Sequence, residues 1–392
     1  MKSTSKILLG ISGGIAAYKA VELVRLLTKS GREVRVVMTE AAKHFVGTAT
    51  FQAVSGRPVT DDAWDKNYPA GMPHIDLARW ADVVLVAPAS ADAMAKFAHG
   101  LAGDLLSTIA LARDVPMIVV PAMNKQMWEH PSTRRNVATL RLDGIAIFGP
   151  GTGEQACGEV GDGRMLEPEE IVAALDAWAQ PKLLAGKRVL LTAGPTQEAI
   201  DPVRVITNLS SGKMGFALAR ACADAGASVT LIAGPCALET PFGVARVNVK
   251  SASDMWDAVQ AHVASADIFV GVAAVADYTP TLPSEQKIKK TDAALTIALT
   301  PTVDILAQVA KLPNAPFCVG FAAESENVEA YAQEKRKRKG IPLIVANRAQ
   351  DALGADENAV TLIDDRGVLP LPAAQKSLVA RKIVAHIAAL VK

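Results

Sequence analysis

The sequence is poor in cysteine and in net charge, and each shortage excludes a class of protein. No two of its four cysteines form a CxxC pair, which argues against a disulfide framework or a zinc site and favours a reducing cytosol. A net charge of +1 creates no field that would attract nucleic acid or an anionic membrane. No apolar run is long enough to span a bilayer, and residues 1–6 lead into an apolar segment without a cleavable signal. We therefore expect a cytoplasmic protein that binds neither nucleic acid nor a membrane.

The chain is long enough for more than one hydrophobic core. Its 392 residues, half of them hydrophobic, correspond to two or three domains at about 100–200 residues each. A short segment at 181–187 contains proline and glycine, and a new apolar strand follows it. We therefore expect one domain over residues 1–180, a linker over 181–187 and a second domain over 188–392.

The first half opens with a strand–turn–helix–strand pattern. An apolar strand at 6–10 leads into a glycine-rich turn at 10–15, an amphipathic helix at 16–30 and a second strand at 34–38. Such a turn presents backbone N–H groups to a phosphate. Ser12 holds the second glycine position of the dinucleotide pattern GxGxxG, which argues against NAD and leaves a mononucleotide such as FMN. The glycines could equally serve turn geometry alone.

Strands and helices keep alternating through this half. The pattern predicts a doubly wound, mostly parallel α/β sheet, whose ligands bind beyond the carboxyl ends of the strands. Polar residues follow the strands there: Thr39, the segments 88–92 and 121–128, and Ser107 and Thr108 in a helix. Further strands are expected at 83–87, 117–120 and 145–148, and helices at 91–98, 104–113 and 171–179.

Residues 153–168 contain four glycines and Cys157. Neither a period of 2 nor one of 3.6 runs through them, so we expect neither strand nor helix. Glycine at this density allows a backbone to approach another group closely. The stretch is either a flap that carries a reactive thiol or a surface loop with an incidental cysteine.

The second half repeats the alternating pattern and predicts a second doubly wound sheet. The segment 207–215 precedes a helix at 216–225, which Ser210 or Ser211 could cap, and it is a candidate anion site without the Walker A pattern. The basic run 335–339 is either a solvated helix face or a group of cations for a polyphosphate. Strands are expected at 188–192, 228–232, 244–249, 267–272, 317–321 and 343–346, and a helix at 327–339.

Several motifs of the first half, taken in order, resemble those of the homo-oligomeric flavin-containing cysteine decarboxylases. Residues 88–92 (PASAD) resemble a PASAN-type motif, residues 121–128 (PAMNKQMW) match PxMNxxMW, and residues 156–158 followed by 161–165 match the flap with the catalytic cysteine. Asp92 replaces an asparagine and Gly14 a common serine. The resemblance implies FMN contacts at Ser12, Gly13, Gly14, Ile15, Thr39, Pro88, Ala89, Ser90, Ser107 and Thr108, and a substrate contact at Met123.

The resemblance also implies a mechanism. Loss of CO2 from a cysteine carboxylate leaves a carbanion that needs an electron sink, and oxidation of the thiol carbon by the flavin supplies one. His74 is matched to the base-side chemistry, Asn124 to the substrate carboxylate and Cys157 to the proton donor of the final reduction. A thiol with an ordinary pKa of about 8.5 is protonated at neutral pH and can donate.

The second half resembles the phosphopantothenoylcysteine synthetases in residues 273–278 (AAVADY), 287–290 (KIKK) and 321–324 (FAAE), and in Asn208 before SSGK. The resemblance implies that 4′-phosphopantothenate and L-cysteine are joined with CTP through an acyl-cytidylate, with Mg²⁺ assisting and its ligands unknown. Asn208 and Lys287 are matched to catalysis, Lys287 and Lys289 to a lid. The other implied contacts are Ala273, Ala274, Val275, Asp277, Val303, Asp304, Ile305, Leu306, Phe321, Lys335 and Lys339.

Together the two halves resemble the bacterial enzymes of coenzyme A biosynthesis in which both activities are fused. This resemblance implies a homo-oligomer, a dodecamer built from trimers of the flavin domain, with ligase domains paired as dimers. Two alternatives are a flavin-binding regulatory protein on the decarboxylase fold and a flavin prenyltransferase. The joint presence of His74, Asn124 and Cys157 argues against the first, and the PxMNxxMW match with the second domain argues against the other.

Overall fold

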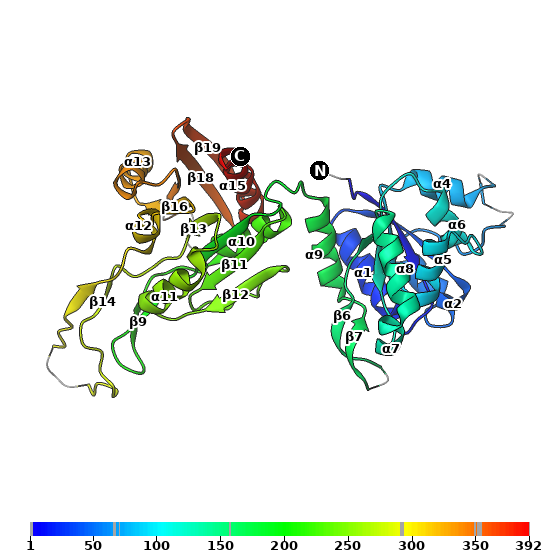
Figure 1. The fold of residues 1–392 in the computed structure, drawn as a ribbon, viewed down its shortest axis with the longest axis horizontal. Coiled ribbons are helices and arrows are strands. Elements are labelled where there is room, and N and C mark those ends of the chain that lie inside the picture. The colour runs from blue at the N-terminus through cyan, green and yellow to red at the C-terminus, as the bar shows by residue number, and fades with distance from the viewer. Residues whose placement is uncertain are drawn as a thin grey trace. The chain divides into compact units, whose positions relative to one another are not determined.

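A computed structural model describes residues 3–65, 68–69, 71–156, 158–290, 294–348, 350 and 355–391. The chain divides into two compact units, Met1–Gln180 and Pro181–Lys392 (Figure 1). Each unit is a sheet covered by helices on both faces. Within the described ranges, no helix is long and apolar enough to cross a membrane.

The first unit is built on a parallel sheet of five strands. Its strand order, β2-β1-β3-β4-β5, is the flavodoxin-like order, in which the order of the strands reverses between β1 and β3 and leaves a crevice there. The strands are β1 (Lys6–Ile11), β2 (Glu33–Met38), β3 (Val83–Ala89), β4 (Met117–Pro121) and β5 (Ala146–Ile147).

Alternate residues of each strand pack into separate cores on the two faces of this sheet. Ile7 and Leu9 of β1 pack with one group of helices, whereas Leu8 packs with the other. One face carries α1 (Ala17–Lys29), α3 (Thr48–Ser55) and α9 (Pro168–Ala179). The other carries α4 (Pro73–Trp80), α5 (Ala91–His99), α6 (Leu105–Ala112) and α8 (Pro131–Leu142), while α2 (Glu40–Lys43) and α7 (Lys125–Glu129) are short helices after β2 and β4.

The expectation of neither strand nor helix for residues 153–168 is wrong. Two short strands, β6 (Gly151–Glu154) and β7 (Val160–Arg164), pair antiparallel as a hairpin, and α9 begins at Pro168. The hairpin is largely exposed, so no apolar period of 2 marks its strands. Its pairing rests on backbone hydrogen bonds, which glycine supplies as well as any residue.

The second unit is built on an eight-stranded sheet in the order β12-β11-β8-β13-β16-β17-β18-β19. The strands run parallel as far as β17, and β18 and β19 are antiparallel. Both sheets confirm the predicted fold class. The strands are β8 (Arg188–Ala193), β11 (Ser228–Ala233), β12 (Val244–Asn248), β13 (Ile268–Gly271), β16 (Phe317–Glu324), β17 (Leu343–Arg348), β18 (Glu357–Asp364) and β19 (Gly367–Gln375).

Helices cover both faces of this sheet as well. One face carries α10 (Lys213–Asp224) and α15 (Lys376–Leu390), and the other carries α11 (Ala252–Val263), α12 (Ile305–Ala310) and α13 (Val328–Lys339). Gly212, in the left-handed region at φ 74°, is the N-cap of α10. The expectation that Ser210 or Ser211 caps this helix is therefore wrong. The segment 181–187 packs on this unit, with Leu184 buried in its core.

Two antiparallel ribbons extend beyond the carboxyl ends of the parallel strands (Figure 1). One pairs β9 (Gln197–Ala199) with β10 (Val205–Thr207), and the other pairs β14 (Tyr278–Pro280) with β15 (Leu299–Pro301). A hydrogen bond from the Ser284 amide to the Ile200 carbonyl oxygen, over 2.9 Å, joins the segments that follow β9 and β14.

Candidate active sites

A cavity of about 650 Å³ lies in the first unit at the carboxyl ends of β1, β3 and β4. This volume is in the range of small-molecule sites. The turn before α1, the segment after β4 and the β6–β7 hairpin supply its walls. The lining residues are Gly13, Gly14, Ile15, Ala16, Tyr18, Lys19, Ser90, Ala91, Ala122, Met123, Asn124, Met127, Glu154, Gln155, Ala156, Gly163, Arg164 and Met165.

The turn at 13–16, at the start of α1, lines this cavity. Among the described residues, no backbone carbonyl accepts a hydrogen bond from the N–H of any residue from Gly13 to Ala16. A Cβ on Gly14 would meet nothing within 4 Å, whereas one on Gly13 would lie 2.5 Å from the Ala41 Cβ. Unpaired N–H groups at the positive end of a 13-residue helix suit a phosphate. The residues present therefore fit the phosphate of FMN.

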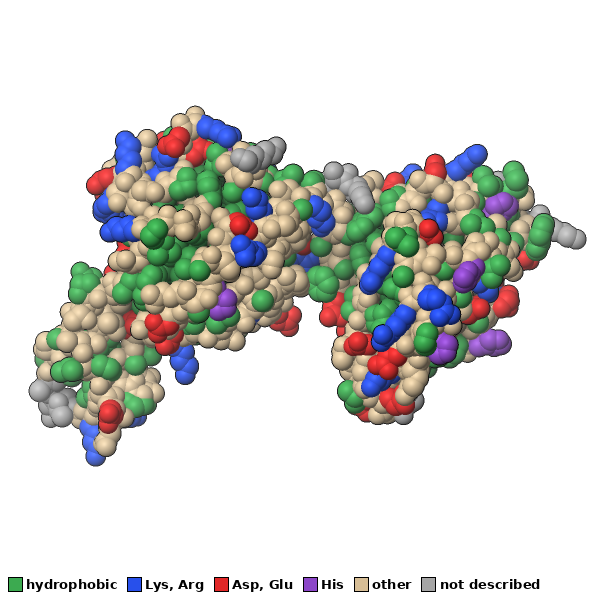
Figure 2. Space-filling model, viewed as in Figure 1, with side chains coloured by type: hydrophobic (Ala, Val, Ile, Leu, Met, Phe, Trp, Pro, Cys, Tyr) green, Lys and Arg blue, Asp and Glu red, His purple; other side chains and the backbone are tan. Residues whose placement is uncertain are grey.

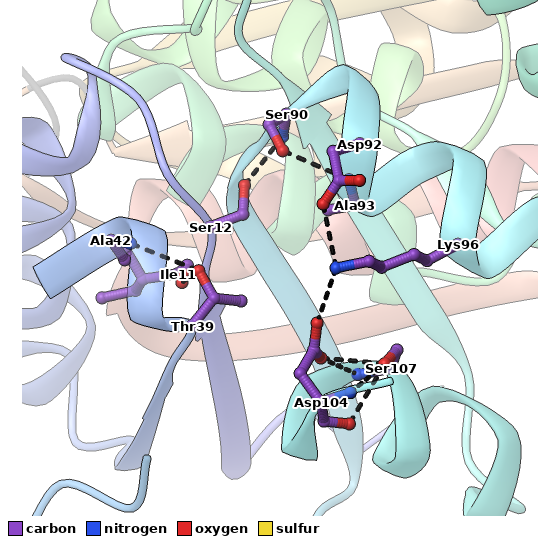
Figure 3. A network of polar contacts seen from close by, with 10 residues as sticks. All are labelled: Ile11, Ser12, Thr39, Ala42, Ser90, Asp92, Ala93, Lys96, Asp104 and Ser107. Carbon is purple, nitrogen blue, oxygen red and sulfur yellow. Dashed lines mark hydrogen bonds and ion pairs between the residues drawn. The ribbon is translucent and has the colours of Figure 1, made fainter. Parts of the chain in front are cut away.

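Most of the other residues expected to contact FMN support the cavity instead of lining it. The buried Ser12 hydroxyl donates to the Pro88 carbonyl oxygen and accepts from the Ser90 amide. The Thr39 hydroxyl accepts from the Ala42 amide at the start of α2. Figure 3 shows the Ser12–Ser90 and Thr39–Ala42 contacts. Of the predicted set, Gly13, Gly14, Ile15 and Ser90 line the cavity, and Ser12, Thr39, Pro88, Ala89, Ser107 and Thr108 do not.

Ser107 and Thr108 are both bonded to Asp104. The Asp104 carboxylate accepts from the Ser107 amide and hydroxyl, each over 2.8 Å, and the Thr108 hydroxyl donates to the Asp104 carbonyl oxygen over 2.8 Å. Lys96 binds Asp104 and Asp92, each at 3.0 Å (Figure 3). Asp92, the departure from the family asparagine, therefore serves an ion pair and is not among the residues that line the cavity.

Asn124 and Met123 line the cavity where the hairpin approaches it. The Met123 amide donates to the Gly163 carbonyl oxygen over 2.9 Å. A Cβ on Gly163 would lie 2.5 Å from the Met123 carbonyl oxygen, so only glycine permits this approach. The Asn124 amide nitrogen Nδ2 donates to the Glu159 carboxylate over 2.5 Å. Glu159 was not among the residues predicted from the sequence.

Two of the predicted catalytic residues of the first unit, Cys157 and His74, are not among the residues that the structure shows lining the cavity. Cys157 lies outside the described residues. His74 is the second residue of α4, is half-buried, and is not among the residues that line the cavity.

The wall formed by α1 and β7 is cationic. Lys19 Nζ and Arg164 Nη2 both bind the same carboxylate oxygen of Glu167, at 2.6 and 3.0 Å. The hydrogen bond from Lys19 is the main reason that the pKa of Glu167 is lowered. The sequence analysis missed this cluster, because Lys19 and Glu167 are far apart along the chain.

A second cavity, of about 200 Å³, lies in the second unit. It opens at the carboxyl ends of β8, β13 and β16, which include the point where the strand order reverses. It is lined by Thr192, Phe269, Gly271, Ala273, Val275, Asp277, Thr302, Val303, Asp304, Ile305, Leu306, Phe321, Lys335 and Lys339. This set includes the predicted contacts except Ala274, Asn208, Lys287 and Lys289.

Two lysines of α13 reach this cavity. Lys339 Nζ binds Asp304 at 2.8 Å, and Lys335 Nζ donates to the Phe321 carbonyl oxygen over 3.3 Å. Burial, followed by the charge of Lys339, lowers the pKa of Lys335. Burial opposes ionisation of Asp304, yet hydrogen bonds from Lys339 and the Ala307 amide hold its pKa below the ordinary value.

The residues of the basic run 335–339 therefore lie in three environments. Lys335 and Lys339 line the cavity, Arg336 is buried with its Nε donating to the Pro342 carbonyl oxygen over 3.1 Å, and Lys337 and Arg338 are exposed. Lys and Arg side chains gather over the α13 region of the second unit in Figure 2. Part of the run is a solvated face and part can neutralise an anion.

Asn208 lies at the edge of the second cavity. Its Nδ2 donates to the carbonyl oxygens of Ala274 and Val275, at 3.1 and 3.2 Å. The Ala274 amide in turn donates to the Gly194 carbonyl oxygen over 2.9 Å. Asn208 therefore holds the segment after β13 that forms the cavity wall.

Lys287 and Lys289 are not among the residues that line the second cavity. They flank Ile288, whose amide donates to the buried Asp201 carboxylate over 3.1 Å and whose carbonyl oxygen accepts from Arg204 over 3.1 Å. The turn after β9 thus anchors the predicted lid. Within the described part of the chain, no three His, Cys, Asp or Glu side chains form a group that could hold a metal ion.

Comparison with known proteins assigns both units. Residues 1–180 match the family model described as Flavoprotein, and residues 184–391 match the model described as DNA/pantothenate metabolism flavoprotein C-terminal domain. The chain is 51% identical to the coenzyme A biosynthesis bifunctional protein of Vibrio vulnificus, over 98% of each chain.

Proteins of other bacteria are similar at slightly lower identity. The coenzyme A biosynthesis bifunctional protein of Escherichia coli is 48% identical over 97% of this chain and 96% of its own length. That of Bacillus subtilis is 45% identical over 100% of this chain and 98% of its own. The chain therefore belongs to the family of bifunctional coenzyme A biosynthesis proteins.

Proposed function

We propose that the cavity of the first unit is the FMN-dependent decarboxylase site and that the cavity of the second unit is the CTP-dependent ligase site. As a member of its family, the protein is a bifunctional enzyme of coenzyme A biosynthesis. It joins 4′-phosphopantothenate to L-cysteine and decarboxylates the product to 4′-phosphopantetheine. The observation that carries the assignment of the first site is the set of unpaired N–H groups from Gly13 to Ala16, in a turn that lines a cavity at the carboxyl end of a flavodoxin-like sheet.

In the decarboxylase site, the turn at 13–16 would hold the phosphate of FMN. When bound, FMN supplies the electron sink that loss of CO2 requires. Asn124 has an amide donor at the cavity wall and orients the carboxylate of the substrate. Cys157 donates a proton to the reduced carbon as a neutral thiol.

His74 acts from another copy of the chain in this proposal. It does not line the cavity of its own unit, so its participation requires a neighbouring flavoprotein unit. We propose that trimers of the flavoprotein unit provide that neighbour, and that paired ligase units extend the trimers to a dodecamer.

In the ligase site, Lys335 and Lys339 neutralise the phosphates of CTP, and Mg²⁺ bound to the nucleotide would supply further positive charge. A carboxylate is a poor acylating agent, so the carboxylate of 4′-phosphopantothenate first attacks the α-phosphate of CTP, which releases pyrophosphate and gives an acyl-cytidylate. The cysteine amine then attacks the acyl carbon, forms the amide and expels CMP. Concentrated positive charge lowers the energy of such a transfer. Asn208 holds the wall on which the acyl-cytidylate lies, and the segment with Lys287 and Lys289 closes over it.

A two-part assay tests this proposal. The purified full-length protein should have a flavin absorption spectrum, and it should release CMP from CTP only when 4′-phosphopantothenate and L-cysteine are both present. Release of CMP without cysteine, or ATP as a better nucleotide than CTP, would contradict the assignment of the ligase site. A protein that binds no FMN would contradict that of the decarboxylase site.

A further inference from the structure

The Glu159 side chain is held by two amide groups at once. Its Oε2 accepts from Asn124 Nδ2 over 2.5 Å, and its Oε1 accepts from Gln126 Nε2 over 2.8 Å. Both donors belong to the start of α7, where Asn124 is the N-cap. Glu159 lies in the hairpin, directly before β7. The side-chain amides of Asn124 and Gln126 thus bind the two oxygens of the Glu159 carboxylate.

The orientation of the Asn124 amide is fixed by a separate contact. Its Oδ1 accepts from the Gln126 backbone N–H over 2.8 Å, so its Nδ2 must point toward Glu159. The arrangement is therefore a donor pair set to receive a carboxylate, and Asn124 itself lines the cavity. Hydrogen bonds to an ionised acceptor are about twice as strong as neutral ones.

We propose that Glu159 occupies the carboxylate subsite of the decarboxylase while no substrate is bound, and that the substrate carboxylate displaces it. This inference rests on the proposed function, in which Asn124 orients that carboxylate. Two carboxylates cannot share these donors, because like charges at contact distance repel. Substrate binding is therefore an exchange of one carboxylate for another.

The exchange links the hairpin to the progress of the reaction. Cys157 is two residues before Glu159 in the sequence, so the segment that must release Asn124 is the one that carries the proton donor. Loss of CO2 removes the charged acceptor from the subsite, and neutral CO2 accepts hydrogen bonds poorly. Glu159 then returns to Asn124 and Gln126. Glu159 is a positioning residue in this account, and it forms no bond to the substrate.

The exchange predicts opposite effects on substrate and product. In Glu159→Leu the substrate carboxylate meets no competitor, so the KM for phosphopantothenoylcysteine should fall, by roughly tenfold for the loss of charged hydrogen bonds. The product, 4′-phosphopantetheine, has no carboxylate and coexists with the Glu159 contact in the wild type. Its inhibition constant should therefore stay the same or rise.

The experiment uses the full-length, flavin-loaded protein and measures the KM and kcat of decarboxylation and the inhibition constant of 4′-phosphopantetheine. The matched control is Asp162→Asn, which removes the same charge from an exposed position of the same hairpin and keeps an acceptor for its Thr152 partner. Glu159→Asp should restore part of the competition. If Glu159→Leu loses its flavin, Glu159→Gln is judged by the same criteria.

The outcomes separate the inference from the proposed function. A lower KM for the substrate without a lower inhibition constant for the product supports the exchange. A KM that stays the same or rises, or equal changes for substrate and product, overturns it and leaves a structural tie between the hairpin and α7. A wild-type protein that does not decarboxylate phosphopantothenoylcysteine contradicts the proposed function itself.

Discussion

The Ser12 hydroxyl donates a hydrogen bond to the Pro88 carbonyl oxygen over 2.8 Å, and the Ser12 amide donates to the same oxygen over 3.2 Å. Ser12 follows β1, and Pro88 lies in β3. These bonds join the end of β1 to β3, the two parallel strands between which the strand order of the sheet reverses. They thereby fix the turn at 13–16, which we propose as the phosphate site of FMN.

Replacement of Ser12 by alanine should weaken FMN binding and lower stability. The substitution leaves the amide of the half-buried Ser90 without its 2.7 Å acceptor, and an unsatisfied donor costs up to about 1–3 kcal/mol where it is buried. Thermal unfolding and flavin content after gel filtration measure the two effects. The control is Ser265→Ala in the second unit, which removes an exposed hydroxyl bonded to the His262 carbonyl oxygen. Equal flavin retention in both variants would remove Ser12 from this role.

Replacement of Cys157 by serine should stop the decarboxylase reaction after CO2 has been released. A serine hydroxyl is a much weaker acid than a thiol, so the last protonation fails while FMN and substrate still bind. Mass spectrometry should then detect an unsaturated thiol product in place of 4′-phosphopantetheine. Cys236→Ser, which changes a half-buried thiol of the second unit, should leave the product unchanged. Accumulation of the saturated product at the wild-type rate in Cys157→Ser would contradict the proton-donor role.

Replacement of Asn208 by aspartate should cause an acyl-cytidylate to accumulate. Aspartate cannot donate to the carbonyl oxygens of Ala274 and Val275, and its charge repels them, so the cavity wall moves out of place. Incubation with CTP and 4′-phosphopantothenate, followed by mass spectrometry, tests for the intermediate. Asn248→Asp, whose oxygen can still accept from Arg246, is the control. If no intermediate can be trapped, Asn208 has no part in its consumption.

The affinity for CTP should decline as the pH rises, and the decline should occur at a lower pH than it would for a lysine of ordinary pKa. Burial and then Lys339 lower the pKa of Lys335, so its charge is lost as the pH rises through that lowered value. Lys335→Arg, which stays charged, should shift the decline in the KM-derived affinity toward higher pH. Lys337→Arg, on the exposed side of α13, should leave the profile unchanged. A decline that does not move in Lys335→Arg would exclude Lys335 as the titrating group.

The parallel cores could be predicted from the sequence because their strands are buried on both faces. Ile7, Leu8 and Leu9 form an uninterrupted apolar run, and the structure divides them between two cores. The last two strands, β18 and β19, are harder to predict from the sequence. In β19, Pro370 and Pro372 interrupt a largely exposed segment, and such residues are tolerated there because β19 is the last strand of the sheet order.

The candidate sites were predictable only where a motif holds its residues close together in sequence. Gly13 and Asn124 belong to such motifs, and both line the first cavity. Glu159 and Glu167 belong to none. Their partners Asn124 and Lys19 are 35 and 148 residues away, so only the folded chain brings the charges together.

The most direct test follows the products of one reaction mixture by mass spectrometry. Full-length, flavin-loaded protein receives 4′-phosphopantothenate, L-cysteine, CTP and Mg²⁺. Wild-type protein should form CMP, pyrophosphate and 4′-phosphopantetheine, whereas Asn124→Leu should form CMP and pyrophosphate with phosphopantothenoylcysteine in place of 4′-phosphopantetheine. A wild-type mixture that stops at phosphopantothenoylcysteine, or that forms no ligated product, would contradict the central claim that this chain catalyses both steps.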